Sequence, residues 1–307
     1  VPQAENSNFK HRPIGLGIMG FQDALYIKKI PYASEHAVTF ADESMEMVSY
    51  YAIKSSSDLA AERGAYSSYK GSLWSKGILP LDSVELLKKE RGEEFIEVDT
   101  TTRLDWEGLK KIVKKQGMRN SNVMAIAPTA TIANITGLTQ SIEPTYSNLF
   151  VKSNLSGEFT IINMHLVDAL KEIGMWDEVM VYDLKNLNGS LEGINRVPEE
   201  LKKLFATSFE VEPKWLIEAA SRRQKWIDQS QSLNLYVSEP NGKKLDVMYK
   251  MAWLRGLKTT YYLRSRSATT SEKSTITNLE LNAVAANQGS EAPEACSILD
   301  PDCEACQ

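Results

Sequence analysis

The chain has 307 residues, of which 42% are hydrophobic, so it is long enough to bury a sizeable core and is expected to be globular. Its apolar runs are short and interrupted by charges, and its polar N-terminus lacks an apolar signal region; we therefore expect a cytoplasmic protein without a membrane span. The net charge is −5, and residues 267–307 contribute −6, so residues 1–266 carry +1. This nearly neutral charge argues against nucleic-acid binding, which needs a basic face.

The first recognisable pattern is the glycine-rich segment GLGIMG at residues 15–20. Its spacing matches the G-x-G-x-x-G pattern with which dinucleotide-binding proteins approach phosphates. That site requires a buried strand just before the first glycine, whereas residues 8–13 are polar and end in Pro13. We therefore favour the alternative, in which the glycines allow close packing at the start of a helix.

Three helices are predicted from apolar spacing and end signals. Residues 36–63 have apolar side chains at roughly helical spacing, and Gly64 is a suitable C-terminal cap. A short amphipathic helix is expected between Asp105, a good N-cap, and Gly117. The segment DVMYKMAWLRG predicts a third helix that stops at Gly256.

Two segments are predicted to be strands. Residues 122–127 (NVMAIA) indicate a buried strand that stops at Pro128, and residues 257–263 (LKTTYYL) indicate a second strand after the third helix. Alternation of strands and helices is typical of parallel α/β units. We therefore expect an α/β domain over residues 1–266.

The segment PTATIAN at residues 128–134 follows the first strand directly. A strand that ends in a threonine-containing turn and opens a helix presents backbone N–H groups and hydroxyls, which suit a phosphate or another anion. An ordinary helix start capped by threonine has the same pattern, so both interpretations stay open.

Tyr261 and Tyr262 are adjacent at the end of the second predicted strand. Successive side chains of a strand point to opposite faces, so the two rings should separate unless the strand twists or bulges. Taken alone, the pair favours a packing role, because tyrosine is common on half-buried sheets.

From Ser267 onward the composition is polar and acidic, which predicts a flexible tail over residues 267–307. The only cysteines, Cys296, Cys303 and Cys306, lie in this tail, which fits a reducing compartment better than a disulfide-stapled fold. The terminal C-x-x-C pair favours thiol–disulfide exchange. Zinc is the competing interpretation, but four ligands are hard to find, so we expect no metal on this chain.

Taken together, these motifs resemble the large, catalytic subunit of class I ribonucleotide reductase. The resemblance runs in order from about Lys10 to Gln307, and it rests on the segments GLGIMG, ERGAYSSYKGS, KGILPLD, GMRNS, PTATIAN and KTTYYLRSR together with the terminal C-x-x-C. It implies the C-terminal half of a ten-stranded α/β barrel with a flexible C-terminal tail. It also implies reduction of ribonucleoside diphosphates to 2′-deoxyribonucleotides by a radical mechanism.

The resemblance assigns roles to nine residues of this sequence. Substrate phosphates are expected at Pro128, Thr129, Ala130, Thr131 and Ile132, although Ala130 stands where some members carry Glu. Tyr261 and Tyr262 match the stacked pair that transfers a radical towards the active-site cysteine. Cys303 and Cys306 match the dithiol that reduces the active-site disulfide after each turnover.

The sequence departs from the family's pattern in one important way: no cysteine precedes Cys296. The family's N-x-C-x-E loop, its reducing cysteine pair and its N-terminal effector region are therefore expected on another polypeptide or an upstream part of a precursor, as in a split-gene or intein-interrupted subunit. The expected partners are this N-terminal half, a small subunit that carries the metal or radical cofactor, and thioredoxin or glutaredoxin. No cofactor is expected on this chain, and nucleotide effectors are expected on the N-terminal part. The alternative is a non-catalytic α/β binding module with a redox- or zinc-responsive C-x-x-C tail.

Overall fold

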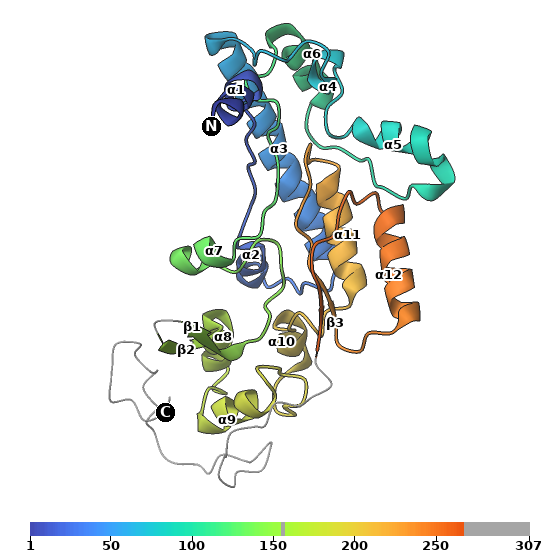
Figure 1. Cartoon of the computed structure of the whole chain (residues 1–307). Coiled ribbons are helices and arrows are strands. Elements are labelled where there is room, and N and C mark those ends of the chain that lie inside the picture. Colours follow the sequence, from blue (N-terminus) through green and yellow to red (C-terminus); the bar gives the residue numbers. More distant parts are fainter. Residues whose placement is uncertain (155–156, 267–307) are drawn as a thin grey trace. The chain divides into compact units, whose positions relative to one another are not determined.

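The computed structural model describes residues 1–154 and 157–266, which form two compact units (Figure 1). Unit 1 comprises residues 1–22, 33–143 and 211–266, and the described part of unit 2 comprises residues 23–32 and 144–210 without 155–156. The predicted tail with its three cysteines lies outside the described residues. Every helix in the described ranges is too short or too polar to cross a membrane.

A parallel sheet forms the centre of unit 1. Strand β3 (Leu235–Val237) pairs in parallel with β4 (Leu263–Ser265). Single parallel bridges join Leu16 to Met124 and Ile126 to Gln231, which extends the parallel pairing over four chain segments. The α/β prediction is therefore confirmed, and residues 122–127 are extended and largely buried as expected. Among the described residues this sheet is open and does not close into a barrel.

The glycines of segment 15–20 allow this sheet to form. A Cβ atom on Gly17 would lie only 2.5 Å from the carbonyl oxygen of Ala125, so the two backbones approach more closely than any side chain permits. The segment follows helix α1 (Pro2–His11), and α2 (Phe21–Ile27) begins only after it. Gly15 and Gly17 thus allow close contact with the extended segment 122–127, and Gly20 (φ 74°) directly precedes α2, in agreement with the favoured interpretation of glycines at a helix start.

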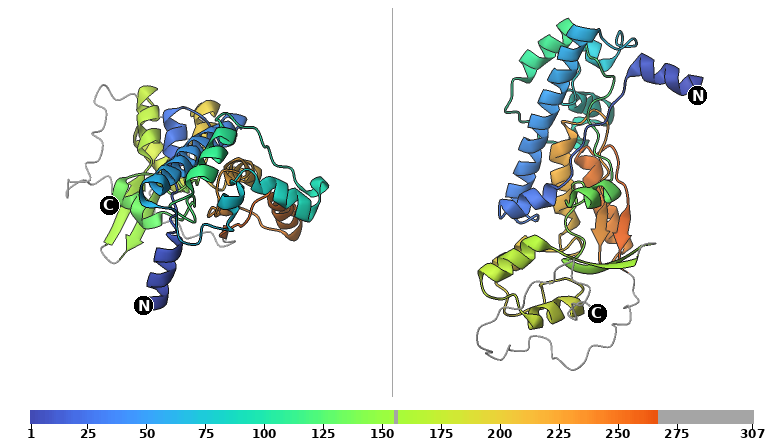
Figure 2. Two further views of the ribbon diagram at one scale, coloured as in Figure 1. Left: turned by 90° about the horizontal axis from the view of Figure 1, so that it is seen from above. Right: turned by 90° about the vertical axis from the view of Figure 1, so that its left-hand side faces the viewer.

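Helices cover the sheet of unit 1. Helix α3 (Glu35–Arg63) packs against α6 (Trp106–Gln116) and α11 (Pro213–Gln224), and α11 also contacts α12 (Gly242–Leu254), as Figure 1 shows. All three predicted helices are confirmed, although α12 begins four residues early. Short helices α4 (Leu73–Lys76), α5 (Ser83–Arg91), η1 (Glu93–Phe95) and α7 (Ala130–Thr136) lie in the connections. Helix α1 has no buried residue and projects from unit 1 (Figure 2).

Two carboxylates that lie one turn apart on α3 form hydrogen bonds within the buried core of unit 1. Asp42 accepts a hydrogen bond from the indole of Trp226 (2.7 Å), and Glu46 accepts one from the indole of Trp106 (3.0 Å). The two indoles are stacked with their ring centroids 5.0 Å apart. Lys225 lies 3.1 Å from Asp42, so a charge partner accompanies that fully buried carboxylate.

Unit 2 contains an antiparallel hairpin followed by helices, none of which was predicted from the sequence. Strand β1 (Leu149–Asn154) pairs with β2 (Gly157–Ile162), and helices α8 (Met164–Glu172), α9 (Glu178–Asn186) and α10 (Glu199–Leu204) follow. Its core includes Tyr26, whose hydroxyl donates to Thr145 at 2.7 Å. Burial raises the pKa of Tyr26 to about 12, so it remains a protonated donor at neutral pH.

The loop after α11 is tied to the sheet by Asp228. Its carboxylate accepts hydrogen bonds from the backbone N–H groups of Met124 (2.6 Å) and Val123 (3.0 Å), both of which are buried residues. Lys258 donates to the carbonyl oxygens of Asp228 (2.8 Å) and Gln229 (2.7 Å) in the same loop. Burial raises the pKa of Asp228 and lowers that of Lys258.

We expect Asp228→Ala to lower the free energy of unfolding by about 2–3 kcal/mol, because two buried N–H groups lose a charged acceptor. Urea unfolding of the full chain measures this change. Asp246→Ala is the matched control, since Asp246 forms only an exposed pair with Lys250 on α12 (2.8 Å) and its loss should matter little. An Asp228 variant as stable as this control would show that Asp228 does not anchor the loop.

Candidate functional site

The segment 127–132 leaves the carboxyl end of a parallel strand, which is where α/β proteins commonly bind ligands. Helix α7 begins at Ala130, immediately after this strand. Four of the five residues predicted to bind phosphate are exposed, namely Pro128, Ala130, Thr131 and Ile132, and the fifth, Thr129, is half-buried. These residues of the loop are therefore accessible to a ligand.

Thr129 does not cap the helix that it precedes. Its hydroxyl instead accepts a hydrogen bond from the backbone N–H of Ser141 at 2.8 Å. The Ser141 hydroxyl donates to the carbonyl oxygen of Ala127 at 3.2 Å, so Ser141 closes the loop from both sides. The N–H groups in the first turn of α7 consequently receive no acceptor from Thr129, as an anion site requires. This weakens the alternative of an ordinary threonine-capped helix.

Ser141 was not predicted from the sequence. Its backbone has φ 47°, in the left-handed region that non-glycine residues rarely adopt, and its side chain is buried. A glycine or asparagine would have signalled such a turn, but a serine in the polar segment 137–141 carries no comparable signal.

Tyr261 and Tyr262 lie side by side, contrary to the expectation that they point to opposite faces. Their ring centroids are 4.0 Å apart, the planes are inclined at 44°, and the Tyr261 hydroxyl donates to that of Tyr262 at 3.1 Å. Regular strand β4 begins only at Leu263, so the alternation of a pleated strand does not apply to the pair. The predicted strand 257–263 is thus displaced towards the C-terminus.

The tyrosine pair is exposed, and its backbone is fixed to the sheet. The exposed fractions are 47% for Tyr261 and 51% for Tyr262, which is more than a packing role on a half-buried sheet requires. The N–H of Tyr261 donates to Leu233 O, and Tyr262 O accepts from Leu235 N, both at 2.8 Å. The hydrogen bond with Tyr262 raises the pKa of the Tyr261 hydroxyl.

Polar side chains lie behind the pair. Asn234 accepts a hydrogen bond from the backbone N–H of Tyr262 at 3.1 Å and donates to Glu143 at 2.7 Å. The hydroxyl of Tyr236 donates to the second carboxylate oxygen of Glu143. Sequence reasoning missed this group, although Asn234 and Tyr236 alternate with leucines in the segment LNLY and could have indicated polar contacts on one face.

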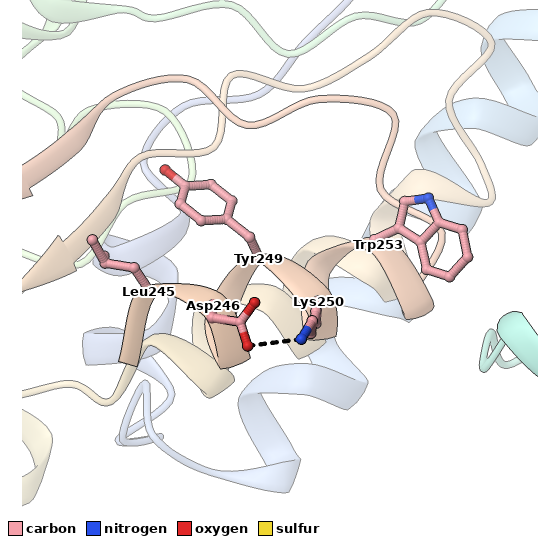
Figure 3. Close-up of a pocket in the computed structure, with 5 residues that line it drawn as sticks. All are labelled: Leu245, Asp246, Tyr249, Lys250 and Trp253. Carbon is pink, nitrogen blue, oxygen red and sulfur yellow. Dashed lines mark hydrogen bonds and ion pairs between the residues drawn. The ribbon is translucent and has the colours of Figure 1, made fainter. Parts of the chain in front are cut away.

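A second surface feature lies on α12, where a shallow depression of about 420 Å³ is lined by five residues of that helix (Figure 3). Figure 3 shows Tyr249 and Trp253 beside the pair formed by Asp246 and Lys250. All of its lining comes from one helix, so it lacks the converging polar groups of a reaction site.

The remaining predicted site residues, Cys303 and Cys306, lie outside the described residues. Within the described ranges, groups of three or more His, Cys, Asp or Glu side chains that could hold a metal ion are absent.

The chain is similar to known proteins over most of its length. Residues 1–263 match the family described as "Ribonucleotide reductase, barrel domain". The ribonucleoside-diphosphate reductase subunit alpha of Chlamydia trachomatis is 57% identical over 99% of this chain, which covers 30% of that protein. The large subunit of Danio rerio ribonucleoside-diphosphate reductase is 42% identical over 87% of this chain, which covers 32% of it.

A solved structure gives the same result for the fold. The class Id ribonucleotide reductase alpha subunit of Actinobacillus ureae superposes with a TM-score of 0.64 at 26% identity, and the match covers 86% of this chain and 41% of that one. The chain therefore spans less than half the length of each of these relatives.

Proposed function

The chain belongs to the ribonucleotide reductase barrel-domain family, and we propose that it forms part of the catalytic barrel of a class I ribonucleoside-diphosphate reductase large subunit. The observation that carries the proposal is the exposed, hydrogen-bonded contact of Tyr261 with Tyr262. A packing role does not need two exposed phenols in contact. A relay of radicals does need them, because each phenol must reach its neighbour.

In the proposed relay an electron and a proton cross between the two phenols. A Tyr262 radical takes both from the Tyr261 hydroxyl, which leaves a Tyr261 radical and a restored Tyr262 phenol; the reverse step balances in the same way. The hydroxyl contact of 3.1 Å gives the proton a direct path. The hydrogen bond also raises the pKa of Tyr261.

We propose that residues 128–132 bind the substrate's phosphates. Accessible residues and the lack of a side-chain cap on α7 support this role, because backbone N–H groups at a helix start can bind an anion. Ala130 supplies no side-chain donor, so binding would rely on backbone N–H groups and on the hydroxyl of Thr131. A ribonucleoside diphosphate is the substrate class that this arrangement and the family imply.

The remaining chemistry requires groups beyond the described residues. We propose that Cys303 and Cys306 carry electrons from thioredoxin or glutaredoxin to the active-site disulfide. The cysteines of that disulfide and the thiyl cysteine would come from another polypeptide segment, since this chain has none before Cys296. A small subunit would supply the metal or radical cofactor, and nucleotide effectors would bind outside this chain.

The edge of the sheet offers a place for that other segment. Gly15 and Gly17 are exposed on the edge strand, and an apolar groove of about 410 Å³ lies beside it, lined in part by Ile14, Leu16 and Tyr51. Exposed strand edges pair readily with another strand. We therefore propose that an extended segment of the cysteine-bearing polypeptide adds to this edge.

We expect Leu16→Lys to weaken the complex between the chain and the cysteine-bearing polypeptide by roughly tenfold or more, because the lysine must be desolvated in an apolar interface. Titration calorimetry measures the affinity. Leu73→Lys is the control, since Leu73 is similarly exposed (50%, against 45% for Leu16) but lies on α4. Equal affinities for the parent and both variants would place the interface elsewhere.

The overall proposal is tested by reconstitution. The chain is mixed with a polypeptide that carries the N-x-C-x-E segment and with a radical-containing small subunit, and deoxyribonucleotide formation from CDP is measured. Product should form only in the complete mixture. If the chain added nothing to the other components, the non-catalytic α/β binding module would be the better interpretation.

A further inference from the structure

We propose that Glu143 and Asn234 are positioning residues for radical transfer: together they hold the backbone of Tyr262 and thereby the contact between the two phenols. This inference rests on the proposed relay through Tyr261 and Tyr262. It assigns a role to two side chains that do not themselves react.

The evidence is a continuous series of hydrogen bonds within unit 1. The Tyr262 N–H donates to the side-chain oxygen of Asn234 (3.1 Å), and the Asn234 amide nitrogen donates to Glu143 (2.7 Å). Tyr236 donates its hydroxyl to the other oxygen of Glu143. Asn234 and Tyr236 are each only 4% exposed, so water cannot readily replace either partner.

The direction of every hydrogen bond in this series is determined. Asn234 must present its oxygen to a backbone N–H, so its nitrogen must face Glu143. Glu143 receives two donors, which a carboxylate accepts without a conflict. Burial and the charge of Glu143 raise the pKa of Tyr236, which keeps that hydroxyl a donor. Replacing the Asn234 amide nitrogen by an oxygen therefore leaves two acceptors facing each other.

The position of Tyr262 explains why this support matters. Main-chain partners on the neighbouring strand hold Tyr261 N and Tyr262 O, whereas a side chain holds the N–H of Tyr262. This N–H belongs to the peptide that joins the two tyrosines. Rotation of that peptide would move one ring against the other and lengthen their 4.0 Å separation. Because the rate of radical transfer depends steeply on the separation of the two phenols, a small rotation of this peptide should slow the transfer markedly.

The test is a reciprocal exchange of polarity. Asn234→Asp places two carboxylates against each other, whereas Glu143→Gln alone is accommodated: its amide oxygen accepts from Asn234, and its amide nitrogen donates to the hydroxyl oxygen of Tyr236, which can also accept. In the double variant N234D/E143Q, the new carboxylate at position 234 accepts from the Tyr262 N–H and from the new amide at position 143. The oxygen of that amide accepts from Tyr236. All three hydrogen bonds are thereby restored with the polarity of the central one reversed.

In the reconstituted enzyme we expect Asn234→Asp to lower kcat by roughly tenfold or more, with KM for CDP within about twofold of the parent, whereas Glu143→Gln alone should keep kcat within about twofold of the parent. The double variant should recover most of the lost kcat, which is a coupling that independent structural damage does not produce. As a second readout, 3-aminotyrosine at position 262 traps the radical, and its electron paramagnetic resonance hyperfine pattern reports the side-chain angle. That pattern should change in Asn234→Asp and return in the double variant.

Parent-like kcat in folded Asn234→Asp, or equal impairment of Asn234→Asp and the double variant, would overturn the positioning role. If a single variant does not fold, the double variant decides: parent-like turnover supports the proposal, and its loss overturns it. The proposed relay is tested separately by the parent chain. The chain with 3-aminotyrosine at position 262 and no other change should form the radical, and the parent chain should form product. If neither is observed, the relay itself is wrong, and the positioning role is wrong with it.

Discussion

Phenylalanine at position 261 or 262 is expected to reduce turnover of the reconstituted enzyme by more than about a hundredfold while CDP still binds. Each replacement keeps the ring but removes the phenolic O–H, so that residue can no longer give up an electron and a proton together. The lost contact between the hydroxyls is on the surface, so the fold should be unaffected. Turnover and CDP binding are measured on the same preparations.

Tyr249→Phe is the matched control for this experiment. Tyr249 is 40% exposed, similar to Tyr261, but it lies on α12, where it lines the shallow depression of that helix. It should retain the parent's turnover. Substantial activity in either the Tyr261 or the Tyr262 variant would return the pair to a packing role and remove the main support for the proposed function.

The elements that the sequence predicted well are those with local signals. Helix α3 ends at Gly64 and α6 lies between Asp105 and Gly117, because caps act over a few residues and are visible in the sequence. The extended segment 122–127 was recognisable because Val123, Met124 and Ile126 are buried in an apolar run, although it forms isolated bridges rather than a regular strand. These features depend little on which distant segments meet them.

Features that depend on distant contacts were missed or misplaced. The expectation for the tyrosine rings assumed a regular strand, but pairing with residues 233–235 begins at Tyr261, before β4 itself. The partnership of Glu143 with Asn234 joins residues 91 positions apart, so no local pattern could predict it. The hairpin of unit 2 was missed because its strands mix polar, charged and apolar residues.

For the terminal dithiol we expect Cys303→Ser and Cys306→Ser each to abolish multiple turnovers with thioredoxin or glutaredoxin while leaving activity with dithiothreitol intact. A single thiol cannot complete the exchange that forms a disulfide and releases two reduced cysteines elsewhere. Dithiothreitol is small enough to reach a buried disulfide that a protein reductant cannot reach. The measurement is product formed per enzyme with each reductant in parallel.

The reach of the segment and the third cysteine make this prediction specific. The composition of residues 267–307 predicts a flexible chain, and such a chain spans roughly 5–6 Å × √n, so about forty residues would reach on the order of 35 Å, enough to connect the barrel mouth with solvent. Cys296 lies on the same segment but outside the C-x-x-C pair, so Cys296→Ser should be nearly normal with every reductant. Normal turnover of both paired variants with the protein reductant would contradict the shuttle. Stoichiometric zinc bound by all three cysteines would replace it with a metal site, because thiolates held by zinc are not free to exchange.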